Sequence, residues 1–373
     1  MTGTAGKGHP SGRNARTRCP GGRRTGRLRY TAAATAAAAA AVLLAACSAT
    51  ASPGGTAAGG GTAAGTAAAG STGGAQSSAP LTIAWNSDPD ASYLPLLMAV
   101  TSMKGQGYSV TTETLSGAAA VAEALATNRA QLSEDKVTGL AAAAASKGAP
   151  LRIIQSLASN DVVWIVKSAD QQCAKLDGQP VGIFGPASSS AYTNEMEYYF
   201  SQNCPSAHPS LVTIPDSTLR AQALLNGQID GTVLDVNDAS VVTGSAKGSQ
   251  FTEVPMSKLL PGVADNYVLA NQNAITSNSG AVQAFETDVL KAIHQLYSNS
   301  SSANLALAKQ YLTKGTYTSA GLLTLVKDKI WYSSGSVNTA GLTKTLQLFK
   351  LPGSAQALTS TALLTKAAAQ VGS

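Results

Sequence analysis

The chain has 373 residues, too many for one small domain, and its 26 Lys and Arg against 20 Asp and Glu give a formal charge of +6. Eight of the basic residues fall within residues 1–30, which hold no acid, so the remainder carries 18 basic and 20 acidic residues, a balance near −2. The high isoelectric point is therefore a property of the N-terminus. It gives no support to nucleic-acid binding by the rest of the chain.

Residues 1–46 have the order of a secretory signal peptide. A positively charged stretch precedes an Ala-rich apolar segment, Thr31–Ala46, which at about 16 residues is short for a membrane span. The segment runs into "LLAAC" (43–47), which resembles a bacterial lipobox. We expect Cys47 to become the lipidated first residue of the mature protein; an uncleaved signal anchor is the alternative.

Residues 47–80 predict a lipidated cysteine followed by a flexible tether. After Cys47 the segment consists mainly of Gly, Ala, Ser and Thr, without charged, aromatic or large aliphatic residues, so it cannot bury a core. A lipid before a tether places the protein outside the cell, anchored to the outer face of the bacterial membrane. Export also favours a disulfide between Cys173 and Cys204, with two buried free thiols as the alternative.

Residues 81–373 predict an α/β fold with mostly parallel sheets, because short apolar runs alternate with helical patterns. Their number, roughly 290, favours two lobes over one core. The strands are expected at 81–85, 108–115, 130–135, 151–157, 161–167, 180–184, 210–215 and 231–236, and the clearest helices at 118–128 and 218–226.

An internal similarity supports the division into two lobes. The segment "ALATNRAQ" (124–131) is similar to "ALLNGQID" (223–230), and each lies in the order strand, turn, helix, strand. Ligands of open parallel sheets bind beyond the carboxyl ends of the strands. Two similar lobes that face each other would therefore enclose a ligand cleft.

Three segments resemble a known family when taken in order: "GQPVGIFGPASSSAYTNEMEYYF", "AEALATNRAQL" with "GLAAAAASKGAPLRII", and "RAQALLNGQIDGTVLDVNDASVV". With the lipobox and the tether, they resemble substrate-binding lipoproteins of ABC importers, in the branch for nitrate, sulfonates, taurine and thiamine precursors. The similarity covers about residues 81–295. It implies a two-lobed type II periplasmic-binding-protein fold, with lobe 1 at 81–169, lobe 2 at 170–263, and a return to lobe 1 with C-terminal helices at 264–373.

The function implied by this resemblance is capture of a small organic molecule and its delivery to an importer permease and ATPase. We expect a monomer without cofactor, metal or nucleic acid. An adhesion or sensor lipoprotein of the same fold is the alternative. A relative of the enzymes that make the thiamine pyrimidine is less favoured, because the chain has neither a catalytic motif nor that group's cysteine cluster.

Candidate ligand residues follow the predicted strands. The serines after strand 180–184 begin a helix, where they either bind ligand or cap the helix. The full predicted set comprises Asn86, Asp88, Tyr93, Ser116, Gly117, Glu134, Ser188, Ser189, Ser190, Tyr192, Asp235, Asn237 and Asp265. For each, a solvated loop position is the alternative. Trp85 is also placed towards the cleft, whereas Trp164 and Trp331 are expected in the core.

The charge of these loops favours one kind of ligand. Their acids are Asp88, Asp90, Glu134, Asp135, Asp235, Asp238 and Asp265, against the single base Lys136. A buried anion usually needs Arg, Lys or many N–H donors. The pattern therefore favours a nitrogen-bearing ligand, an amine or heteroaromatic, over a sulfonate, unless most of these acids point into water.

Overall fold

The computed structural model describes residues 79–136, 150–187, 190–313 and 317–372, apart from the side chains of 264–265. The expected signal peptide, Cys47 and most of the tether therefore lie outside the described residues, as do Ser188, Ser189 and the side chain of Asp265. Within the described part, no helix combines the length and the apolar character needed to cross a membrane.

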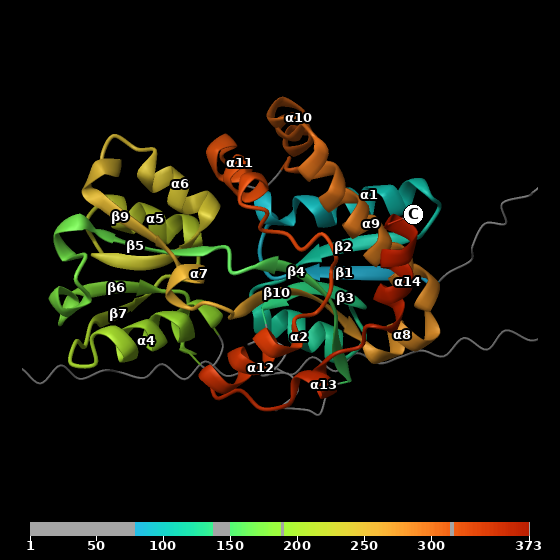
Figure 1. Ribbon diagram of the computed structural model, residues 1–373, viewed down its shortest axis with the longest axis horizontal. Helices are drawn as coiled ribbons and strands as arrows, with labels where there is room; N and C mark the ends of the chain where they lie inside the picture. Colours follow the sequence, from blue (N-terminus) through green and yellow to red (C-terminus); the bar gives the residue numbers. More distant parts are fainter. Residues whose placement is uncertain (1–78, 137–149, 188–189, 314–316, 373) are drawn as a thin grey trace, which may run out of the picture. The chain divides into compact units, whose positions relative to one another are not determined.

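The first lobe is built on a five-stranded sheet in the order β2-β1-β3-β10-β4 (Figure 1). Its strands are β1 (Leu81–Trp85), β2 (Val110–Thr114), β3 (Leu132–Lys136), β4 (Leu151–Ser159) and β10 (Ala264–Asn271). β10 runs antiparallel to both β3 and β4, whereas β1 is parallel to β2 and β3. Four strands therefore share one direction, and β10 returns against them.

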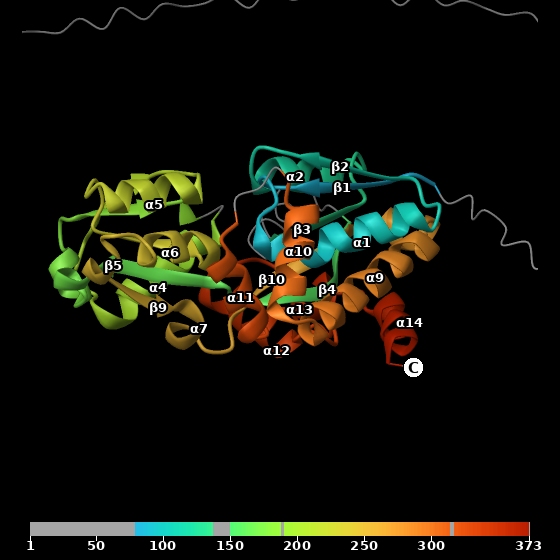
Figure 2. The same cartoon turned by 90° about the horizontal axis from the view of Figure 1, so that it is seen from above.

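Helices cover both faces of this sheet. They are α1 (Leu94–Gly105), α2 (Ala118–Ala126), α8 (Gln272–Ser277), α9 (Ser279–Ser298), α10 (Ser301–Tyr311), α11 (Ser319–Lys327), α12 (Thr339–Leu348), α13 (Ala355–Leu358) and α14 (Ala362–Val371). On one face α1 packs on α9 around Leu94, Phe285 and Trp331 (Figure 2). On the other face Leu125 of α2 and Leu342 of α12 share a second apolar cluster.

The second lobe repeats this plan in the order β7-β6-β8-β5-β9. Its strands are β5 (Val162–Lys167), β6 (Pro180–Ile183), β7 (Ser210–Thr213), β8 (Gly231–Asp235) and β9 (Phe251–Pro255), and its helices are α4 (Ala191–Asn203), α5 (Ser217–Leu225), α6 (Val236–Thr243) and α7 (Met256–Leu259). β5 runs antiparallel to β8 and β9. Trp164 packs against Phe200 on one side of the sheet, and Ile165 and Leu224 share the cluster on the other.

The predicted fold class is confirmed, because both sheets are mixed with mostly parallel strands and helices on their faces. Every predicted strand forms, and each of its ends lies within two residues of the expected bound. Trp164 and Trp331 are buried core residues, as expected. The sheets divide before residue 169: β5, which the expected boundaries place in lobe 1, pairs in the second sheet.

The internal similarity extends to the way the two matching helices end. Asn128 after α2 and Gly227 after α5 occupy the same place in the repeated segment, and both adopt a positive φ, 60° and 70°. Each donates its N–H to the carbonyl three residues back, at 3.1 Å to Leu125 and 3.0 Å to Leu224. Gly and Asn are the residues that adopt this conformation at least cost, so the repeat carries its own helix stop.

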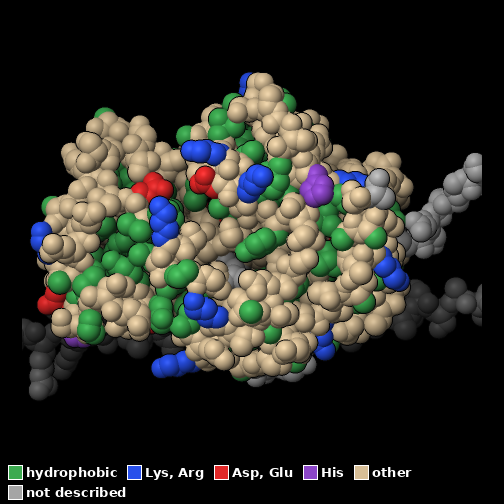
Figure 3. Space-filling model, in the orientation of Figure 1, with side chains coloured by type: hydrophobic (Ala, Val, Ile, Leu, Met, Phe, Trp, Pro, Cys, Tyr) green, Lys and Arg blue, Asp and Glu red, His purple; other side chains and the backbone are tan. Residues whose placement is uncertain are grey.

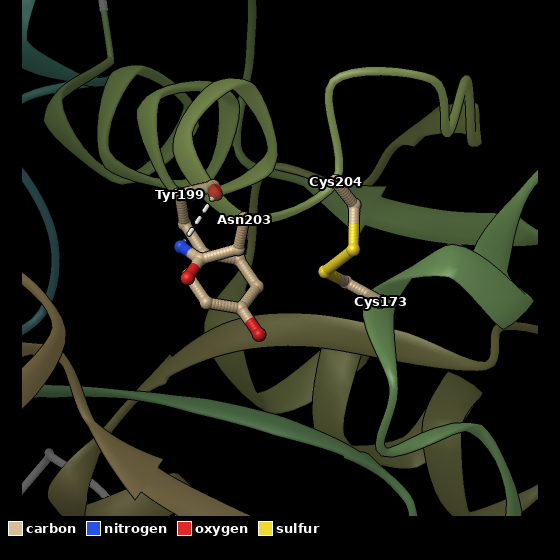
Figure 4. The surroundings of a disulfide bond; sticks show 4 residues. All are labelled: Cys173, Tyr199, Asn203 and Cys204. Carbon is tan, nitrogen blue, oxygen red and sulfur yellow. Dashed lines mark hydrogen bonds between the residues drawn. A yellow bond between two sulfur atoms is a disulfide. The ribbon is translucent and has the colours of Figure 1, made fainter.

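The predicted disulfide between Cys173 and Cys204 is present, with Cα atoms 5.9 Å apart (Figure 4). Cys173 opens the short 3₁₀ helix Cys173–Leu176 before β6, and Cys204 directly follows α4. One turn of α4 next to the bond is reinforced by Asn203, whose side-chain amide donates to the Tyr199 carbonyl at 2.9 Å. The bond therefore ties the approach to β6 to the end of the helix that follows it.

Candidate functional site

Polar side chains at the ends of β1 and β3 meet in the first lobe. The hydroxyl of Tyr93 donates to Oδ1 of Asn86 at 3.0 Å, and Nδ2 of Asn86 donates to Oδ1 of Asp135 at a long 3.4 Å. The Tyr93 ring packs edge-on against Trp85, 5.5 Å between centroids, and both rings are buried. Trp85, expected to face the cleft, is instead buried and packs against the Tyr93 ring.

Glu134 is the most perturbed acid of this group. It is 7% exposed, and burial raises its pKa to about 8. The neighbouring carboxylates of Asp135 and Asp161 contribute to this raised pKa, whereas the Tyr93 hydroxyl and the Lys136 ammonium oppose it. Burial and the Glu134 charge in turn raise the pKa of Tyr93 well above its usual value. The Glu134 carboxyl group therefore carries a proton at neutral pH.

The second lobe contributes a matching set from α4, β8 and α6. The hydroxyl of Tyr192 donates to Oδ1 of Asp235, the last residue of β8, at 2.5 Å. Asp238 lies within the first turn of α6, and its Oδ1 accepts from Thr218 at 3.3 Å. Burial raises the pKa of Asp238, and the Asp235 charge adds to the effect.

Arg220 on α5 is the buried cation beside this set. Its guanidinium lies 5.9 Å from the Tyr192 ring centroid and 5.7 Å from that of Phe184. It donates to three backbone carbonyls, and burial lowers its pKa while the charge of Asp235 raises it. A cation stacked on aromatic faces fixes the ring of Tyr192.

Contacts connect residues of the two sheets. Nζ of Lys136, the last residue of β3, lies 4.5 Å from the Tyr192 ring centroid and 3.8 Å from Oδ1 of Asp161, which precedes β5. Nδ2 of Asn266 on β10 donates to the same Asp161 oxygen at 3.2 Å. We call the residues joined in this way the polar cluster: Asn86, Asp90, Tyr93, Glu134, Asp135, Lys136, Asp161, Tyr192, Arg220, Asp235, Asp238 and Asn266.

Asp90 belongs to the cluster through its charge. It caps the 3₁₀ turn Ala91–Tyr93, where Oδ1 accepts from the backbone N–H of Ser92 at 2.8 Å. Its pKa is raised to about 7, mainly by burial and in part by the Asp235 carboxylate, so the charge at the end of β8 acts on a residue that follows β1. Asp90 thus titrates near neutrality despite its hydrogen bonds.

Several predicted residues lie apart from the cluster. Asp88 and Ser116 are exposed. Gly117 has a φ of 86°, a conformation suited to glycine, and its N–H donates to the Asn86 carbonyl at 3.1 Å, so it positions Asn86. Asn237 is buried, and its Oδ1 accepts the N–H of Thr318 at 2.7 Å.

The Asn237 contact joins α6 to α11, and glycine is needed there. A Cβ at Gly321 would meet Cα of Asn237 at 2.8 Å, closer than real Cβ contacts allow. Ser240 of α6 is also hydrogen-bonded to Thr318. Asn237 is thus a joint between the second lobe and a C-terminal helix, which its type and place after β8 did not indicate.

A separate cavity of about 330 Å³ lies beside the disulfide. It is lined mostly by apolar groups, including Phe200, Pro209 and Leu211, with Cys204 at its wall. It shares no residue with the polar cluster. We take the cluster as the candidate site because it joins the strand ends of both sheets, where ligands of this architecture bind.

Ser190 acts as the N-cap of α4, because its Oγ accepts the N–H of Thr193 at 3.2 Å. We expect Ser190→Ala to lower the free energy of unfolding by about 1 kcal/mol, the usual cost of losing such a cap. Chemical denaturation of the ligand-free protein measures the effect. Ser257→Ala, at an exposed serine of α7, is the control and should unfold like the parent. An unchanged Ser190→Ala would contradict the capping role.

Sequence reasoning missed Arg220 and Asp161. Arg220 lies in a helix whose pattern predicts only an apolar face and a solvated face. Asp161 lies where the chain crosses between the two sheets. The pair Asn160–Asp161 between two apolar runs was a usable signal, because polar residues buried between strands need partners.

Two mixed sheets of matching strand order, with polar side chains at facing strand ends, define the class as the periplasmic-binding-protein fold. Residues 103–303 match the NMT1/THI5-like family, and the chain belongs to this family. A comparison with curated proteins gives no match.

Solved structures of the same fold include proteins named for ABC-type import, sulphonate binding and nitrate binding. The ligand-binding component of an ABC-type import system from Staphylococcus aureus, with zinc bound, has a TM-score of 0.61 at 13% identity over 77% of this chain and 98% of that one. The aliphatic sulphonate-binding protein SsuA from Escherichia coli has 0.56 at 14%, over 73% and 85%. The nitrate-binding protein NrtA from Synechocystis has 0.60 at 11%, over 79% and 89%.

The side chains of the candidate site also bear on metal binding. Among the side chains that the structure describes, no group of three or more His, Cys, Asp and Glu is arranged to hold a metal ion. The acids of the polar cluster are instead engaged with tyrosine, asparagine, lysine and arginine.

Proposed function

We propose that this protein is an extracytoplasmic solute-binding lipoprotein that holds a small organic molecule between its lobes and delivers it to the permease and ATPase of an ABC importer. The observation that carries the proposal is the polar cluster. In it Lys136, the last residue of β3, lies over the Tyr192 ring of α4. The charge of Asp235, the last residue of β8, raises the pKa of Asp90, which follows β1. Three solved proteins of this fold are named for ABC import, sulphonate binding or nitrate binding, which supports the same role here.

A binding role is favoured over the biosynthetic alternative by the state of the cysteines. An enzyme of that group is expected to carry a cysteine cluster. Within the described residues, Cys173 and Cys204 are joined to each other, next to the cavity beside the disulfide rather than in the polar cluster. An adhesion or sensor lipoprotein would share the fold, and no contact among the described residues favours it.

The test is a thermal-shift screen of the full chain, solubilised in detergent, against a library of small metabolites. A compound present at about 100 times its dissociation constant should add about 2.7 kcal/mol of stability. Tyr192→Phe, which removes the hydroxyl that Asp235 accepts, should reduce the shift given by any hit, whereas Tyr198→Phe, on the same helix outside the cluster, should leave it unchanged. If no compound shifts the melting temperature, or if both variants respond like the parent, the proposal fails.

The anchoring part of the proposal rests on the "LLAAC" segment that ends the apolar stretch. We expect Cys47→Ser to leave the protein unprocessed or to release it from the membrane fraction, because serine cannot carry the thioether lipid. Cell fractionation and intact-mass measurement check this, with Cys19→Ser as the control that should remain anchored. Lipid-modified, membrane-retained Cys47→Ser protein would contradict the lipoprotein assignment.

A further inference from the structure

The polar cluster holds more acid than base. Its acidic members are Asp90, Glu134, Asp135, Asp161, Asp235 and Asp238, and its basic members are Lys136 and Arg220. Glu134, Asp135 and Asp161 are each at least 93% buried, so they are not surface charges screened by water. On the face drawn in Figure 3, acidic side chains form only a few small patches, among scattered Lys and Arg.

A buried amide oxygen of the cluster, that of Asn266, also favours a ligand with an N–H group. Asn266 is 4% exposed, and its Nδ2 donates to Asp161. That bond fixes the orientation of the amide, because the Asp161 carboxylate can only accept from it. Oδ1 of Asn266 is left buried without a hydrogen-bond donor among the described residues. A buried carbonyl oxygen without a donor costs free energy, and an N–H group of a ligand would remove that cost.

The cluster already surrounds one ammonium group of the chain itself. The ammonium of Lys136 lies over the Tyr192 ring, beside the Asp161 carboxylate. An aromatic face next to a carboxylate is a favourable place for an ammonium group. Even with protons on Glu134 and Asp90, four acids of the cluster face one lysine and one arginine, so further positive charge would be stabilised here.

We propose that the ligand of this site is an organic cation, an amine, amidine or quaternary ammonium, whose charge is held by the carboxylates around Glu134 and Asp235 and whose apolar part lies against the tyrosines of the cluster. This inference rests on the proposed binding function. It separates the protein from solved relatives named for anions, the sulphonate-binding and nitrate-binding proteins.

Binding of a cation should then be coupled to proton release. In the ligand-free protein, burial raises the pKa of Glu134 to about 8 and that of Asp90 to about 7, so protons occupy these carboxyl groups near neutrality. The charged groups that face Glu134 are Asp135, Lys136 and Asp161, with the Tyr93 hydroxyl; those that face Asp90 are Asp235 and Asp238. A cation must displace a proton to pair with Glu134. Its affinity should therefore rise about tenfold per pH unit below the pKa of that group.

The experiment is calorimetric titration of the full chain in detergent from about pH 6 to about pH 8. The cationic probes are choline, benzylammonium and benzamidinium. Each is paired with a neutral isostere: the analogue of choline with a tert-butyl group in place of trimethylammonium, benzyl alcohol, and benzamide. We expect at least one cation to bind about tenfold or more tightly than its neutral partner, with heats in two buffers of different ionisation enthalpy that report proton release.

Substitutions of single acids show which carboxyl group binds the cation. Glu134→Gln should weaken the bound cation about tenfold or more and remove most of its pH dependence. Glu113→Gln, which breaks only the exposed ion pair with Arg129, is the matched control and should bind like the parent. Asp90→Asn is the second variant if Glu134→Gln does not fold, and it should reduce the pH dependence below about pH 7.

Nitrate and ethanesulfonate are titrated in the same way, to test whether the site binds an anion instead of a cation. Nη2 of buried Arg220 has no acceptor among the described residues, and an anion would use it. Binding of an anion or a neutral compound, with no heat from any cationic probe at millimolar concentration, overturns this inference and leaves the proposed binding function intact. A chain that binds neither these probes nor any library compound loses both.

Discussion

Glu286→Gln should stabilise the protein at high pH and leave it nearly unchanged at low pH. Glu286 lies on α9 with no exposed surface, and neither carboxylate oxygen has a hydrogen-bond partner among the described residues. Burial raises its pKa from 4.5 to about 8. Because the folded state then holds a proton that the unfolded state releases, stability falls between about pH 4.5 and pH 8, where this penalty reaches on the order of 5 kcal/mol.

The difference between the variant and the parent isolates this group, since Glu134 and Asp90 also have raised pKa values and titrate in both proteins. Urea denaturation at intervals from about pH 4 to about pH 9 should show two curves that meet in acid and separate as the pH rises. Glu197→Gln, at an exposed glutamate of α4, should follow the parent throughout. Parallel curves for Glu286→Gln and the parent would show that the folded state ionises this carboxyl group at no cost.

Loss of the Cys173–Cys204 bond should also have a large effect on stability, in this case a destabilising one. The two residues are 31 positions apart, and closing a loop of this length restricts the unfolded chain by about 3–4 kcal/mol in the chain-entropy model. We expect reduction, or the double change Cys173→Ala and Cys204→Ala, to lower the free energy of unfolding by about this amount. Ligand affinity should change little, because neither residue belongs to the polar cluster.

The measurement is guanidinium denaturation with and without a reductant, together with the mass of the alkylated protein. The double alanine variant is the internal control, because a reductant should not affect it further. Two cysteines that alkylate in the non-reduced parent would rule the bond out. Equal unfolding midpoints for the oxidised and reduced parent would show that the bond adds no stability.

Most strands of the fold could be read from the sequence because their signals are local, but β9 and β10 were not predicted. Buried parallel strands such as Leu81–Trp85 and Gly231–Asp235 appear as short apolar runs between turns, and their order predicts the sheet type. The directions of β5 and β10, by contrast, could not be predicted from the sequence. Each runs against its neighbours only because the chain crosses from one sheet to the other there, and no local pattern encodes that crossing.

The candidate site was predictable in part for the same reason. Asn86, Tyr93, Glu134, Tyr192 and Asp235 were found because residues after parallel strands gather at one edge of a sheet. Exposure was not predictable: Asp88 points into water, whereas Glu134 is buried. That difference depends on what packs over each loop, which residues distant in sequence decide.

The joint between Asn237 and Thr318 changes how the C-terminal region should be regarded. α11 contacts α10 and the turn Ala91–Tyr93, and through Thr318 it also holds α6 of the second lobe. This contact connects the two lobes in addition to the two strand crossings and the contacts of the polar cluster. The close approach at Gly321 leaves no space for even a methyl group at that contact. The tail is therefore a structural brace, and any rotation of one lobe against the other must carry α11 with it or detach it.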